Sequence, residues 1–595
     1  MKKVERLRQW LREHKLDAYI FPSTDPHCGE YVPDHWKTRE WISGFNGSAG
    51  TAVVTLKRAA LWTDSRYWLA AEEQLAGTPF ELIRCRRNVA TADELIEWIR
   101  QEHAPGEPLA VGIDGWVNTI DSVQELREAL QNEGEQLVVA PDPAEKLWED
   151  RPVIPLNPIE IHPLEFAGEE AKHKIGRLRE KLHDLHADGI LITQLDDIAW
   201  LTNLRGTDVH CCPLFVSYMA ITMNEATLFT DPRQVGPKVA EYLKEQDIKL
   251  DNYEHVHCPT GKVIIDTATC NHHIGGTQKD IIKNKDLVGT MKAIKNEAEI
   301  RGYHSAMHKD GVALVKFLRW LTTGEWSMVD GQWTMNGKVV TEISIDQKLT
   351  GLRAEQPLYR DISFDTIAGY GAHGAIVHYE ATPETDIPLE PHGLLLLDSG
   401  AQYQDGTTDI TRTIALGPLT EEEKTDYTLV LKGHIRLAMA KFPVGSSGTQ
   451  LDILARNAMW QHGINFLHGT GHGVGSYLNV HEGPHQIRMN YMPTPLVAGM
   501  TLTNEPGIYK AGKHGCRTEN TQLITHYCDG EFGEFLQFEP LTLCPIDTRP
   551  IRLDIMATDE IEWLNAYHEK VYQELSPLLD DEADRNWLRE ATKEI

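Results

Sequence analysis

The distribution of hydrophobic and polar positions divides the first part of the chain into alternating helix-like and strand-like segments. Residues 2–14 carry apolar side chains at helical spacing, and residues 18–21 form a short apolar run typical of a buried strand. Apolar runs at 51–55 and 60–63 predict two more strands, and residues 67–75 again follow a helical pattern. Helices that alternate with strands in this way predict an α/β layer.

A cluster of prolines marks the end of this layer. Six prolines fall within residues 141–163. Because proline fixes φ and lacks a backbone N–H, it disfavours helix interiors and central strands, so this segment is predicted to be a linker. A second helix–strand pattern begins at Glu169 and runs into an apolar segment at 189–193.

The second pattern repeats motifs of the first. Trp-Ile-Ser-Gly-Phe-Asn-Gly at 41–47 is echoed by Trp-Leu-Thr-Asn-Leu-Arg-Gly at 200–206, and Leu-Trp-Thr-Asp-Ser-Arg at 61–66 by Leu-Phe-Thr-Asp-Pro-Arg at 228–233. The offsets are 159 and 167 residues, which fits a duplicated domain with a small insertion. Similarity at a nearly fixed spacing indicates duplication, although two unrelated αβ segments can share such motifs by chance.

The remainder of the chain has a different organisation. A helical pattern covers residues 296–320, and an unbroken apolar run at 394–397 predicts a buried strand that leads into Asp398. Glycine-rich turns and short strands follow, and the C-terminal residues show two helical patterns, at 558–579 and 582–592.

The length of 595 residues exceeds what one hydrophobic core fills, so several domains are expected. We predict two similar domains at residues 1–155 and 156–290. A third domain is predicted at residues 291–595, with its C-terminal helices starting near residue 546.

Charge and composition narrow the functional classes. Lys and Arg number 58 against 88 Asp and Glu, and the resulting net charge of −30 argues against nucleic acid or a membrane as a partner. No apolar stretch reaches the roughly 18 residues of a membrane span, and the charged N-terminal helix has no apolar signal core. Nine cysteines without a Cys-x-x-Cys zinc motif indicate reduced thiols. We therefore expect a cytoplasmic protein.

Five residues of the third region form a candidate set of metal ligands. Each lies beside strand-like or glycine-turn sequence, where a rigid backbone can aim its side chain. They are Asp398, Asp409, His472, Glu505 and Glu519. Four carboxylates and one imidazole suit two divalent cations, because a carboxylate can bridge two ions. Hard oxygen ligands with a single imidazole and no thiolate favour Mn²⁺, with Zn²⁺, Co²⁺ and Fe²⁺ as alternatives.

Each of these residues, taken alone, has a simpler structural explanation. An aspartate at a strand end usually caps a turn, and a histidine in a glycine-rich loop is more often structural than a ligand. Residues 505–507 could be only a surface turn. The prediction of a metal site therefore depends on the joint pattern and on no single residue.

The segments around the five residues resemble the metal motifs of the pita-bread metallopeptidases, a superfamily that includes methionine aminopeptidase, prolidase, creatinase and aminopeptidase P. These segments are 398–400, 409–413, 468–475, 504–507 and 517–520. Residues 374–379 and 478–484 resemble the proline-specific branch. Residues 22–27 and 43–52 resemble the long, three-domain aminopeptidases P, and 538–542 extend the likeness to nearly the whole chain.

The resemblance implies a fold with α/β and α+β parts: two similar N-terminal α/β domains of the creatinase N-terminal type, then a pita-bread catalytic domain. It also implies a metal-dependent aminopeptidase that releases the N-terminal residue from short peptides with proline second, and a homodimer. In the family, one metal ion is held by residues that match Asp398, Asp409 and Glu519. The second ion is held by residues that match Asp409, His472, Glu505 and Glu519.

The resemblance assigns further roles to histidines. His378 and His481 match histidines that contact the substrate and shuttle protons, and His468 matches a third active-site histidine near the peptide. Glu505 is expected to accept the proton of the attacking water and to pass it to the leaving nitrogen. His378 or His481 is expected to stabilise the oxyanion.

Other functions remain as alternatives. A prolidase would cleave only dipeptides with C-terminal proline, and such enzymes usually carry one N-terminal domain. Methionine aminopeptidase lacks these N-terminal domains, and creatinase works without the full metal set. A non-catalytic pita-bread module that binds peptides would have lost ligands, whereas all five positions are filled here.

Overall fold

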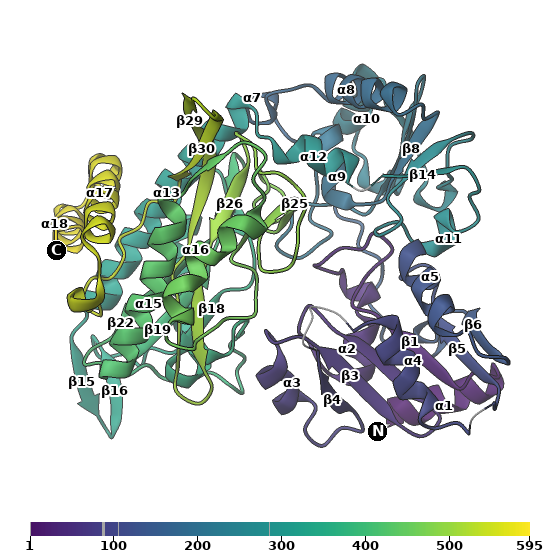
Figure 1. Ribbon diagram of the computed structural model, residues 1–595, viewed down its shortest axis with the longest axis horizontal. Coiled ribbons are helices and arrows are strands. Elements are labelled where there is room, and N and C mark those ends of the chain that lie inside the picture. Colours follow the sequence, from purple (N-terminus) through teal and green to yellow (C-terminus); the bar gives the residue numbers. More distant parts are fainter. Residues whose placement is uncertain (1, 86–89, 105, 285) are drawn as a thin grey trace. The chain divides into compact units, whose positions relative to one another are not determined.

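Two sheets with one topology account for the repeated motifs at the start of the chain (Figure 1). The computed structural model describes residues 2–85, 90–104, 106–284 and 286–595. Within these residues, the two sheets have six strands each, in the orders β4-β3-β2-β1-β5-β6 and β12-β11-β10-β8-β13-β14. The first comprises β1 (Ala18–Phe21), β2 (Thr51–Thr55), β3 (Ala59–Thr63), β4 (Glu81–Arg84), β5 (Leu109–Ile113) and β6 (Glu135–Val139). The second comprises β8 (Gly189–Ile192), β10 (Tyr218–Thr222), β11 (Ala226–Phe229), β12 (Lys249–Asp251), β13 (Val263–Ile265) and β14 (Ile281–Lys283).

The strand directions agree as well as the strand order. β1 is antiparallel to β2 and parallel to β5, just as β8 is antiparallel to β10 and parallel to β13. The prediction of a duplicated domain is therefore confirmed as two mixed sheets of one topology. Both sheets belong to one compact unit, formed by Met1–Leu164 and Glu169–Val288, which we call the N-terminal unit. A division near residue 155 stays a prediction.

The repeated sequence motifs form the same local structures. The tryptophan motifs end the helices α2 (Thr38–Ser43) and α9 (Leu195–Thr202). Each helix is followed by a residue in the left-handed region, Gly44 at φ 82° and Asn203 at φ 51°. Glycine and asparagine are the residues that adopt this C-terminal conformation most readily, which explains why the two motifs differ in this position without a change in shape.

The second repeated motif is an aspartate turn closed by arginine. Asp64 accepts the backbone N–H of Arg66 at 3.0 Å and binds its guanidinium with both carboxylate oxygens. Asp231 binds the backbone N–H and the guanidinium of Arg233 in the same way. An aspartate that accepts a backbone N–H two residues ahead is a common turn former, so both copies retain it at the end of the third strand.

Burial on both faces explains the continuous apolar runs in these sheets. Tyr19 of β1 packs into the core beneath helix α1 (Lys2–Glu13), whereas Ile20 packs into the core beneath helix α4 (Ala92–Arg100). Successive side chains of a strand point to opposite faces, so both must be apolar. The predicted linker contains a four-residue helix, α6 (Ala144–Leu147), and a two-residue strand, β7 (Glu160–Ile161).

The C-terminal unit comprises Glu165–Gly168 and Gly289–Ile595. Its first long helix, α13 (Glu297–Thr323), confirms the helical pattern at 296–320. Asn296 is the N-cap, because its side chain accepts the backbone N–H groups of Ala298 at 2.8 Å and Glu299 at 3.0 Å. A capping asparagine satisfies donors that have no partner inside the helix.

Two sheets of the C-terminal unit carry the functional segments. One has the order β18-β19-β22 and the other β23-β30-β29-β26. Leu394 of β19 packs with helix α15 (Glu421–Ala438), whereas Leu395 packs with α13, so the four-leucine run is buried on both faces. The strands are β18 (Ile367–Tyr370), β19 (Leu394–Ser399), β22 (Ile410–Ala415), β23 (Lys441–Pro443), β26 (Thr501–Asn504), β29 (Asn520–Gly530) and β30 (Gly533–Pro540).

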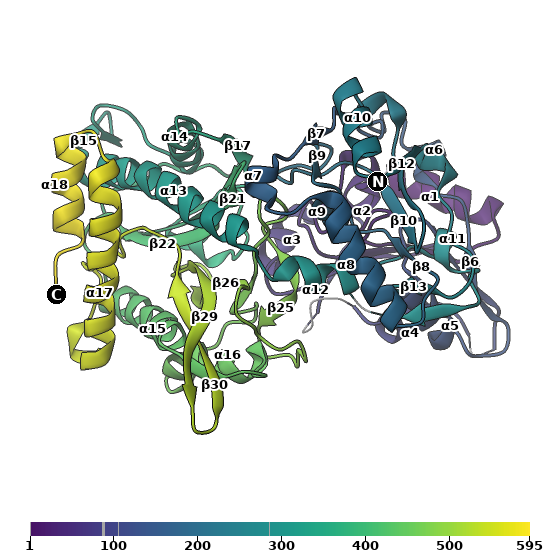
Figure 2. The ribbon, with the colours of Figure 1, turned by 90° about the horizontal axis from the view of Figure 1, so that it is seen from above.

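The chain ends in two helices that lie side by side (Figure 2). They are α17 (Thr558–Leu575) and α18 (Glu582–Ala591). The helical pattern at 558–579 is confirmed: α17 ends at Leu575, and a 3-10 turn, Ser576–Leu578, continues directly from it. Pro577 has no N–H to continue the α-helical hydrogen bonds.

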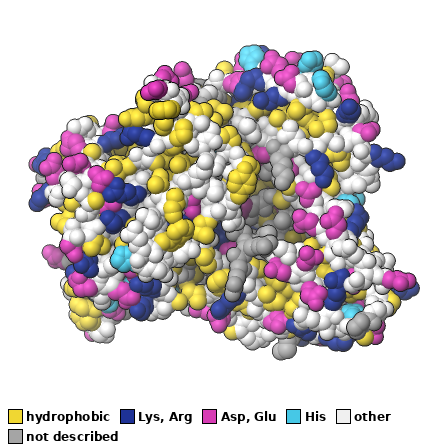
Figure 3. Space-filling model, in the orientation of Figure 1, with side chains coloured by type: hydrophobic (Ala, Val, Ile, Leu, Met, Phe, Trp, Pro, Cys, Tyr) yellow, Lys and Arg dark blue, Asp and Glu magenta, His cyan; other side chains and the backbone are white. Residues whose placement is uncertain are grey.

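The described residues include no helix that is both long and apolar enough to cross a membrane. On the face shown in Figure 3, acidic and basic side chains are interspersed over the surface of each unit. The net charge of −30 is therefore not gathered into one acidic patch on this face.

Candidate metal centre

Pairing of β19 with β22 brings the first two predicted ligands together. Asp398 of β19 lies opposite Thr411 of β22, and Asp409 directly precedes β22. Because alternate residues of a strand point to one face, Asp409, Thr411 and Asp398 share that face. The two aspartates are therefore diagonal neighbours across the strand pair.

Pairing of β26 with β29 does the same for the two glutamates. Asn504 at the end of β26 lies opposite Asn520 at the start of β29. Glu505 directly follows Asn504, and Glu519 directly precedes Asn520, so the two carboxylates extend from adjacent strand ends. The backbone N–H of Glu519 donates to the carbonyl of Thr411 at 3.1 Å, which joins this sheet to the strand beside Asp409.

His472 lies between these carboxylates. It belongs to β24 (Gly471–Gly473), and its Nε2 lies 3.5 Å from Oδ2 of Asp409 and 3.4 Å from Oε1 of Glu505. Its Nδ1 faces the carbonyl of Gly473 at 2.8 Å. Since a carbonyl only accepts hydrogen bonds, Nδ1 carries the proton and the Nε2 lone pair faces the carboxylates.

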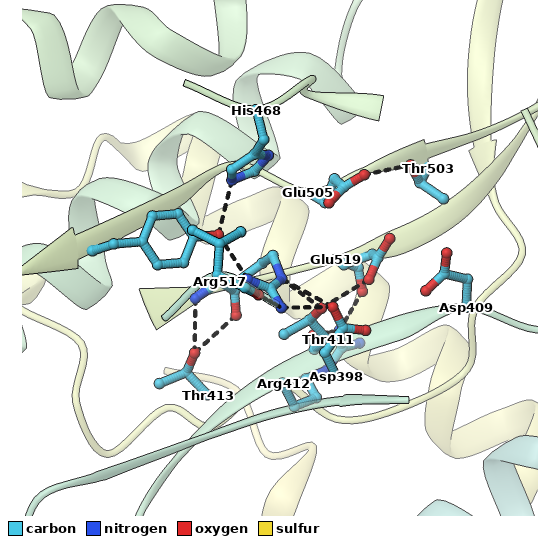
Figure 4. Close-up of polar contacts among 12 residues, drawn as sticks. Asp398, Asp409, Thr411, Arg412, Thr413, His468, Thr503, Glu505, Arg517 and Glu519 are labelled. Carbon is cyan, nitrogen blue, oxygen red and sulfur yellow. Dashed lines mark hydrogen bonds and ion pairs between the residues drawn. The ribbon is translucent and has the colours of Figure 1, made fainter. Parts of the chain in front are cut away.

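The structure brings together the donor atoms of three ligands closely enough to share ions. Ligand atoms of Asp409, His472 and Glu519 all lie within 4.8 Å of one another. Figure 4 shows Asp398, Asp409, Glu505 and Glu519 extending toward a common space from different strands. The joint pattern predicted from the sequence is therefore a cluster in three dimensions.

Burial and the repulsion of neighbouring carboxylates raise the pKa values of Asp409, Glu505 and Glu519. The pKa of Asp409 is raised well above its usual value by burial and then by Asp398 and Glu505, and that of Glu519 by burial and then by Asp409. Burial raises the pKa of Glu505 to about 7, although Arg517 opposes the shift. Several carboxylates in a buried site repel one another unless cations compensate them.

One carboxylate oxygen of Asp398 gives direct evidence that this site binds a metal ion. Among the described residues, Oδ1 of Asp398 is buried and has no hydrogen-bond partner, while Oδ2 accepts two hydrogen bonds from Arg517. A buried carboxylate oxygen without a partner is costly. Together with the hard oxygen donors and one imidazole, this orphaned atom shows that the residues fit divalent cations.

Arg517 is the main counter-charge of the cluster. Its Nη2 lies 2.7 Å and its Nε 3.1 Å from Oδ2 of Asp398, and its Nη1 donates to the hydroxyl of Tyr509 at 2.7 Å. The hydroxyl of Tyr509 in turn lies 2.8 Å from Nε2 of His468. A partly buried chain of polar contacts thus connects His468 to Asp398 (Figure 4).

Arg412 fixes the backbone beside Glu519. Its Nη1 donates to the carbonyl of Glu519 at 2.6 Å, and its Nη2 donates to Oδ1 of Asn520 at 2.9 Å. Its Nε and Nη2 also bind the carbonyls of Pro545 and Cys544. The buried guanidinium therefore ties the start of β29 to the segment that leads into the C-terminal helices.

The three predicted histidines lie around this cluster. The ring of His481 lies 4.3 Å from that of His472, edge to face at 87°. His468 joins through Tyr509, as described above. His378 directly follows Val377, whose carbonyl accepts a hydrogen bond from Arg517 at 3.4 Å. The catalytic and substrate-binding roles of His378, His468 and His481 stay predictions.

Sequence reasoning did not assign roles to Arg517, Tyr509, Thr411 or Arg412. Arg517 belongs to the motif segment 517–520. Its position in the sequence does not indicate that it binds Asp398, which lies 119 residues away. The sequence indicates a role for Thr411 only indirectly. Side chains alternate along a strand, so Thr411, two residues after Asp409, is expected on the same face as Asp409. Its hydroxyl donates to Oε2 of Glu519 at 2.8 Å.

Comparisons with known proteins agree with this organisation. The model of metallopeptidase family M24 matches residues 301–526, and that of its C-terminal region matches residues 534–595. Two models of the creatinase/prolidase N-terminal domain match residues 3–147 and 150–299. The fold and the buried carboxylate site thus define a metallopeptidase of family M24 with duplicated N-terminal domains.

Full-length relatives identify the branch of that class. Aminopeptidase P1 of Lotus japonicus is 37% identical over 100% of this chain and 99% of its own length. A probable Xaa-Pro aminopeptidase P of Aspergillus niger is 37% identical over 100% of this chain and 98% of its own length. The crystal structure of an X-prolyl aminopeptidase from Caenorhabditis elegans matches this chain with a TM-score of 0.92 and 34% sequence identity. The match covers 100% of this chain and 99% of that one, which is described as a cytosolic enzyme with a di-nuclear active site. The chain belongs to the aminopeptidase P family, which confirms the family predicted from the sequence.

Proposed function

We propose that this chain is a metal-dependent aminopeptidase that releases the N-terminal residue from peptides with proline in the second position. The observation that carries the proposal is the convergence of Asp409, His472 and Glu519 donor atoms within 4.8 Å, in a chain whose full-length relatives are named Xaa-Pro aminopeptidases. The prolidase alternative is not favoured, because those relatives match both N-terminal domains as well. A non-catalytic module is not favoured, because no ligand type is missing.

Two divalent ions would be held by the five clustered residues. Asp398, Asp409 and Glu519 are proposed to hold one ion, and Asp409, His472, Glu505 and Glu519 the other. The C. elegans relative is described as having a di-nuclear active site, which supports two ions. Mn²⁺ is the proposed occupant, since carboxylates outnumber the single imidazole and no thiolate is present. When bound, such ions supply Lewis-acid polarisation of a carbonyl and activation of water.

Glu505 is the proposed proton acceptor and donor. In the protein without cations, burial raises the pKa of Glu505 to about 7. Its Oε1 is held by the hydroxyl of Thr503 at 3.2 Å, which fixes its orientation. The leaving group is the tertiary amide nitrogen of proline, which must gain a proton to depart.

The histidines are proposed to bind the peptide. His481, packed against His472, and His378, which follows Val377 in the chain, can donate hydrogen bonds to the developing oxyanion or to the peptide carbonyl. His468 is held by Tyr509 and is proposed to line the proline pocket. Proline has no N–H, so this pocket needs no acceptor for one.

Location and assembly are further proposals. We propose that the protein is cytoplasmic, because the C. elegans relative is described as a cytosolic enzyme. We also propose a homodimer, which sedimentation velocity would test. A monomer at micromolar concentration would contradict the dimer without affecting the proposed activity.

The proposed function is tested by chelating the protein, restoring Mn²⁺ and measuring free arginine released from Arg-Pro-Pro, with Ala-Pro and Met-Ala as comparison substrates. Release of arginine that depends on added metal is expected. Cleavage confined to Ala-Pro would identify a prolidase, and preference for Met-Ala would identify a methionine-type enzyme. No hydrolysis with any metal would leave the non-catalytic alternative.

A further inference from the structure

The segment that carries His378 is held by a carboxylate from outside the metal site. We call residues 370–379 the histidine loop; it begins at the end of β18, contains the 3-10 helix η4 (Gly371–Ala375) and ends just beyond His378. Glu342, the first residue of helix α14 (Glu342–Ala354), lies beside it and is 0% exposed.

Three donors of the histidine loop converge on the two oxygens of Glu342. The backbone N–H of Tyr370 donates to Oε1 at 2.8 Å, and the hydroxyl of Tyr379 donates to Oε2 at 2.8 Å. Nδ1 of His373 lies 2.9 Å from Oε1 and 3.0 Å from Oε2. The donors stand before and after His378 in the chain, so one buried carboxylate fixes both sides of that residue.

Glu342 is not needed to cap its own helix. Thr341 is the N-cap of α14, and its hydroxyl accepts the backbone N–H of Ser344 at 3.3 Å. The hydroxyl of Ser344 accepts the backbone N–H of Thr341 at 2.7 Å. With the helix start satisfied by this reciprocal pair, the carboxylate of Glu342 serves the histidine loop.

Strand β28 (His514–Arg517) closes the loop from a second side. A Cβ atom on Gly515 would lie 1.7 Å from the carbonyl oxygen of Gly374, so the two backbones are in direct contact. Arg517 donates to the carbonyl of Val377 at 3.4 Å. The loop is therefore held between α14 and the strand that precedes Glu519.

We propose that Glu342 is a positioning residue that sets the orientation of His378 toward the peptide. This inference rests on the proposed function, because it takes His378 as a group that contacts the substrate. Hydrogen bonds to a buried carboxylate are stronger than neutral ones, so they hold the loop where a neutral acceptor would hold it less firmly. A displacement of about 1 Å at a substrate-binding group lowers turnover by as much as about 10²-fold.

The test uses variants that remove one hydroxyl and keep the ring, because Glu342→Ala would leave three buried donors without an acceptor. Tyr379→Phe removes one donor to Glu342, together with the longer contacts of the same hydroxyl to the carbonyl and the hydroxyl of Thr385, both at 3.2 Å. Tyr370→Phe is the matched control, since its hydroxyl lies in the same loop but donates to the carbonyl of His392 at 3.0 Å. Both variants are expected to retain the metal content of the wild type, and Tyr379→Phe is expected to lower the thermal midpoint, because the buried carboxylate of Glu342 loses one donor.

Tyr379→Phe is expected to lower kcat for a Xaa-Pro-Yaa peptide by about 10-fold, and Tyr370→Phe by less than about 2-fold. Glu342→Gln retains one oxygen as acceptor for the Tyr370 N–H. Its kcat is expected to lie between those of the wild type and Tyr379→Phe, or to equal that of Tyr379→Phe. In a His378→Ala background the effect of Tyr379→Phe is expected to vanish, because both changes act through one group. An equal effect in both backgrounds would overturn the positioning role.

Hydrogen exchange of the histidine loop supplies a readout that does not depend on activity. Backbone amides of residues 370–379 are expected to exchange faster in Tyr379→Phe than in Tyr370→Phe. Unchanged exchange together with unchanged kcat would overturn the inference. A wild-type protein without Xaa-Pro activity would refute the proposed function instead, while the exchange experiment would still show whether Glu342 holds the loop.

Discussion

Three of the five proposed ligands are oriented by a second side chain whose role the sequence did not reveal. Arg517 holds Asp398, Thr411 holds Glu519 and Thr503 holds Glu505. The ligand types themselves were predictable, because few chemistries need four carboxylates and an imidazole beside strand ends. Arg517 and Thr411 were not predictable as their partners, because these contacts join segments that are far apart in the sequence and meet only in the folded chain. The amide of Asn504, beside Glu505, donates a hydrogen bond to the carbonyl of His434 at 2.9 Å.

The division of ligands between two ions can be tested by metal content. Asp409 and Glu519 are proposed to contact both ions, so Asp409→Ala and Glu519→Ala are expected to lose both, whereas His472→Ala is expected to lose chiefly one. Elemental analysis of dialysed protein measures this directly. Glu531→Ala, at an exposed position of the β29–β30 turn, is the control and is expected to retain both ions. Near two ions per chain in either bridging variant would refute the assignment.

The buried carboxyl groups predict how metal-free protein responds to pH. The pKa of Glu505 is raised from 4.5 to about 7, so the native state keeps a proton that the unfolded chain releases in that interval. The stability from this group is fully present below pH 4.5 and is lost as the pH rises through 7. Relative to metal-free Glu505→Gln, metal-free wild type is expected to lose as much as about 3 kcal/mol of unfolding free energy from low to high pH.

Denaturant titrations of both chelated proteins at pH 4.5 and pH 8 measure this difference. Added Mn²⁺ is expected to stabilise the wild type more at pH 8 than at pH 4.5, because ligands must be deprotonated to bind a cation. Equal pH dependence of the two metal-free proteins would show that Glu505 titrates normally.

At the scale of elements, the sequence predicted those segments that are buried on both faces. The runs that became β1 and β19 are apolar throughout because helices cover both sides of their sheets. Register could not be predicted, since it depends on which strand lies beside which. Yet register creates the site: Asn504 opposite Asn520 is what places Glu505 next to Glu519.

Close contact between η4 and β28 predicts that Gly515 cannot be replaced. A Cβ at this position would lie 1.7 Å from the carbonyl oxygen of Gly374, so one backbone must move. Gly515→Ala is expected to destabilise the C-terminal unit by about 2 kcal/mol or more and to lower kcat by displacing the histidine loop. Gly351→Ala, in helix α14 with nothing within 4 Å of the added atom, is expected to be neutral or stabilising. The two variants are compared by thermal midpoint and by the rate of peptide hydrolysis. Equal thermal midpoints would contradict the close contact between Gly515 and the carbonyl of Gly374.

For the whole molecule, the duplication was readable because its motifs have local structural causes. Local contacts determine the left-handed conformation of Gly44 and Asn203 and the turns closed by Arg66 and Arg233. Both copies therefore keep similar short motifs in the sequence. The rest of the two sheets diverged, because a buried apolar position accepts several residues of similar size. The same physics hides most long-range contacts from a single sequence.

The central claim is that the whole chain is an aminopeptidase selective for proline in the second position. It is tested most directly by kcat/KM on matched peptides, Ala-Pro-Ala, Ala-Pro and Ala-Ala-Ala, with the Mn²⁺-loaded enzyme. A ring-shaped pocket discriminates by about 1–3 kcal/mol per misfit contact, that is, by about 10- to 200-fold. Ala-Pro-Ala is expected to be cleaved at least as well as Ala-Pro and at least about 10-fold better than Ala-Ala-Ala. Equal cleavage of Ala-Pro-Ala and Ala-Ala-Ala, or cleavage of Ala-Pro alone, would contradict the account.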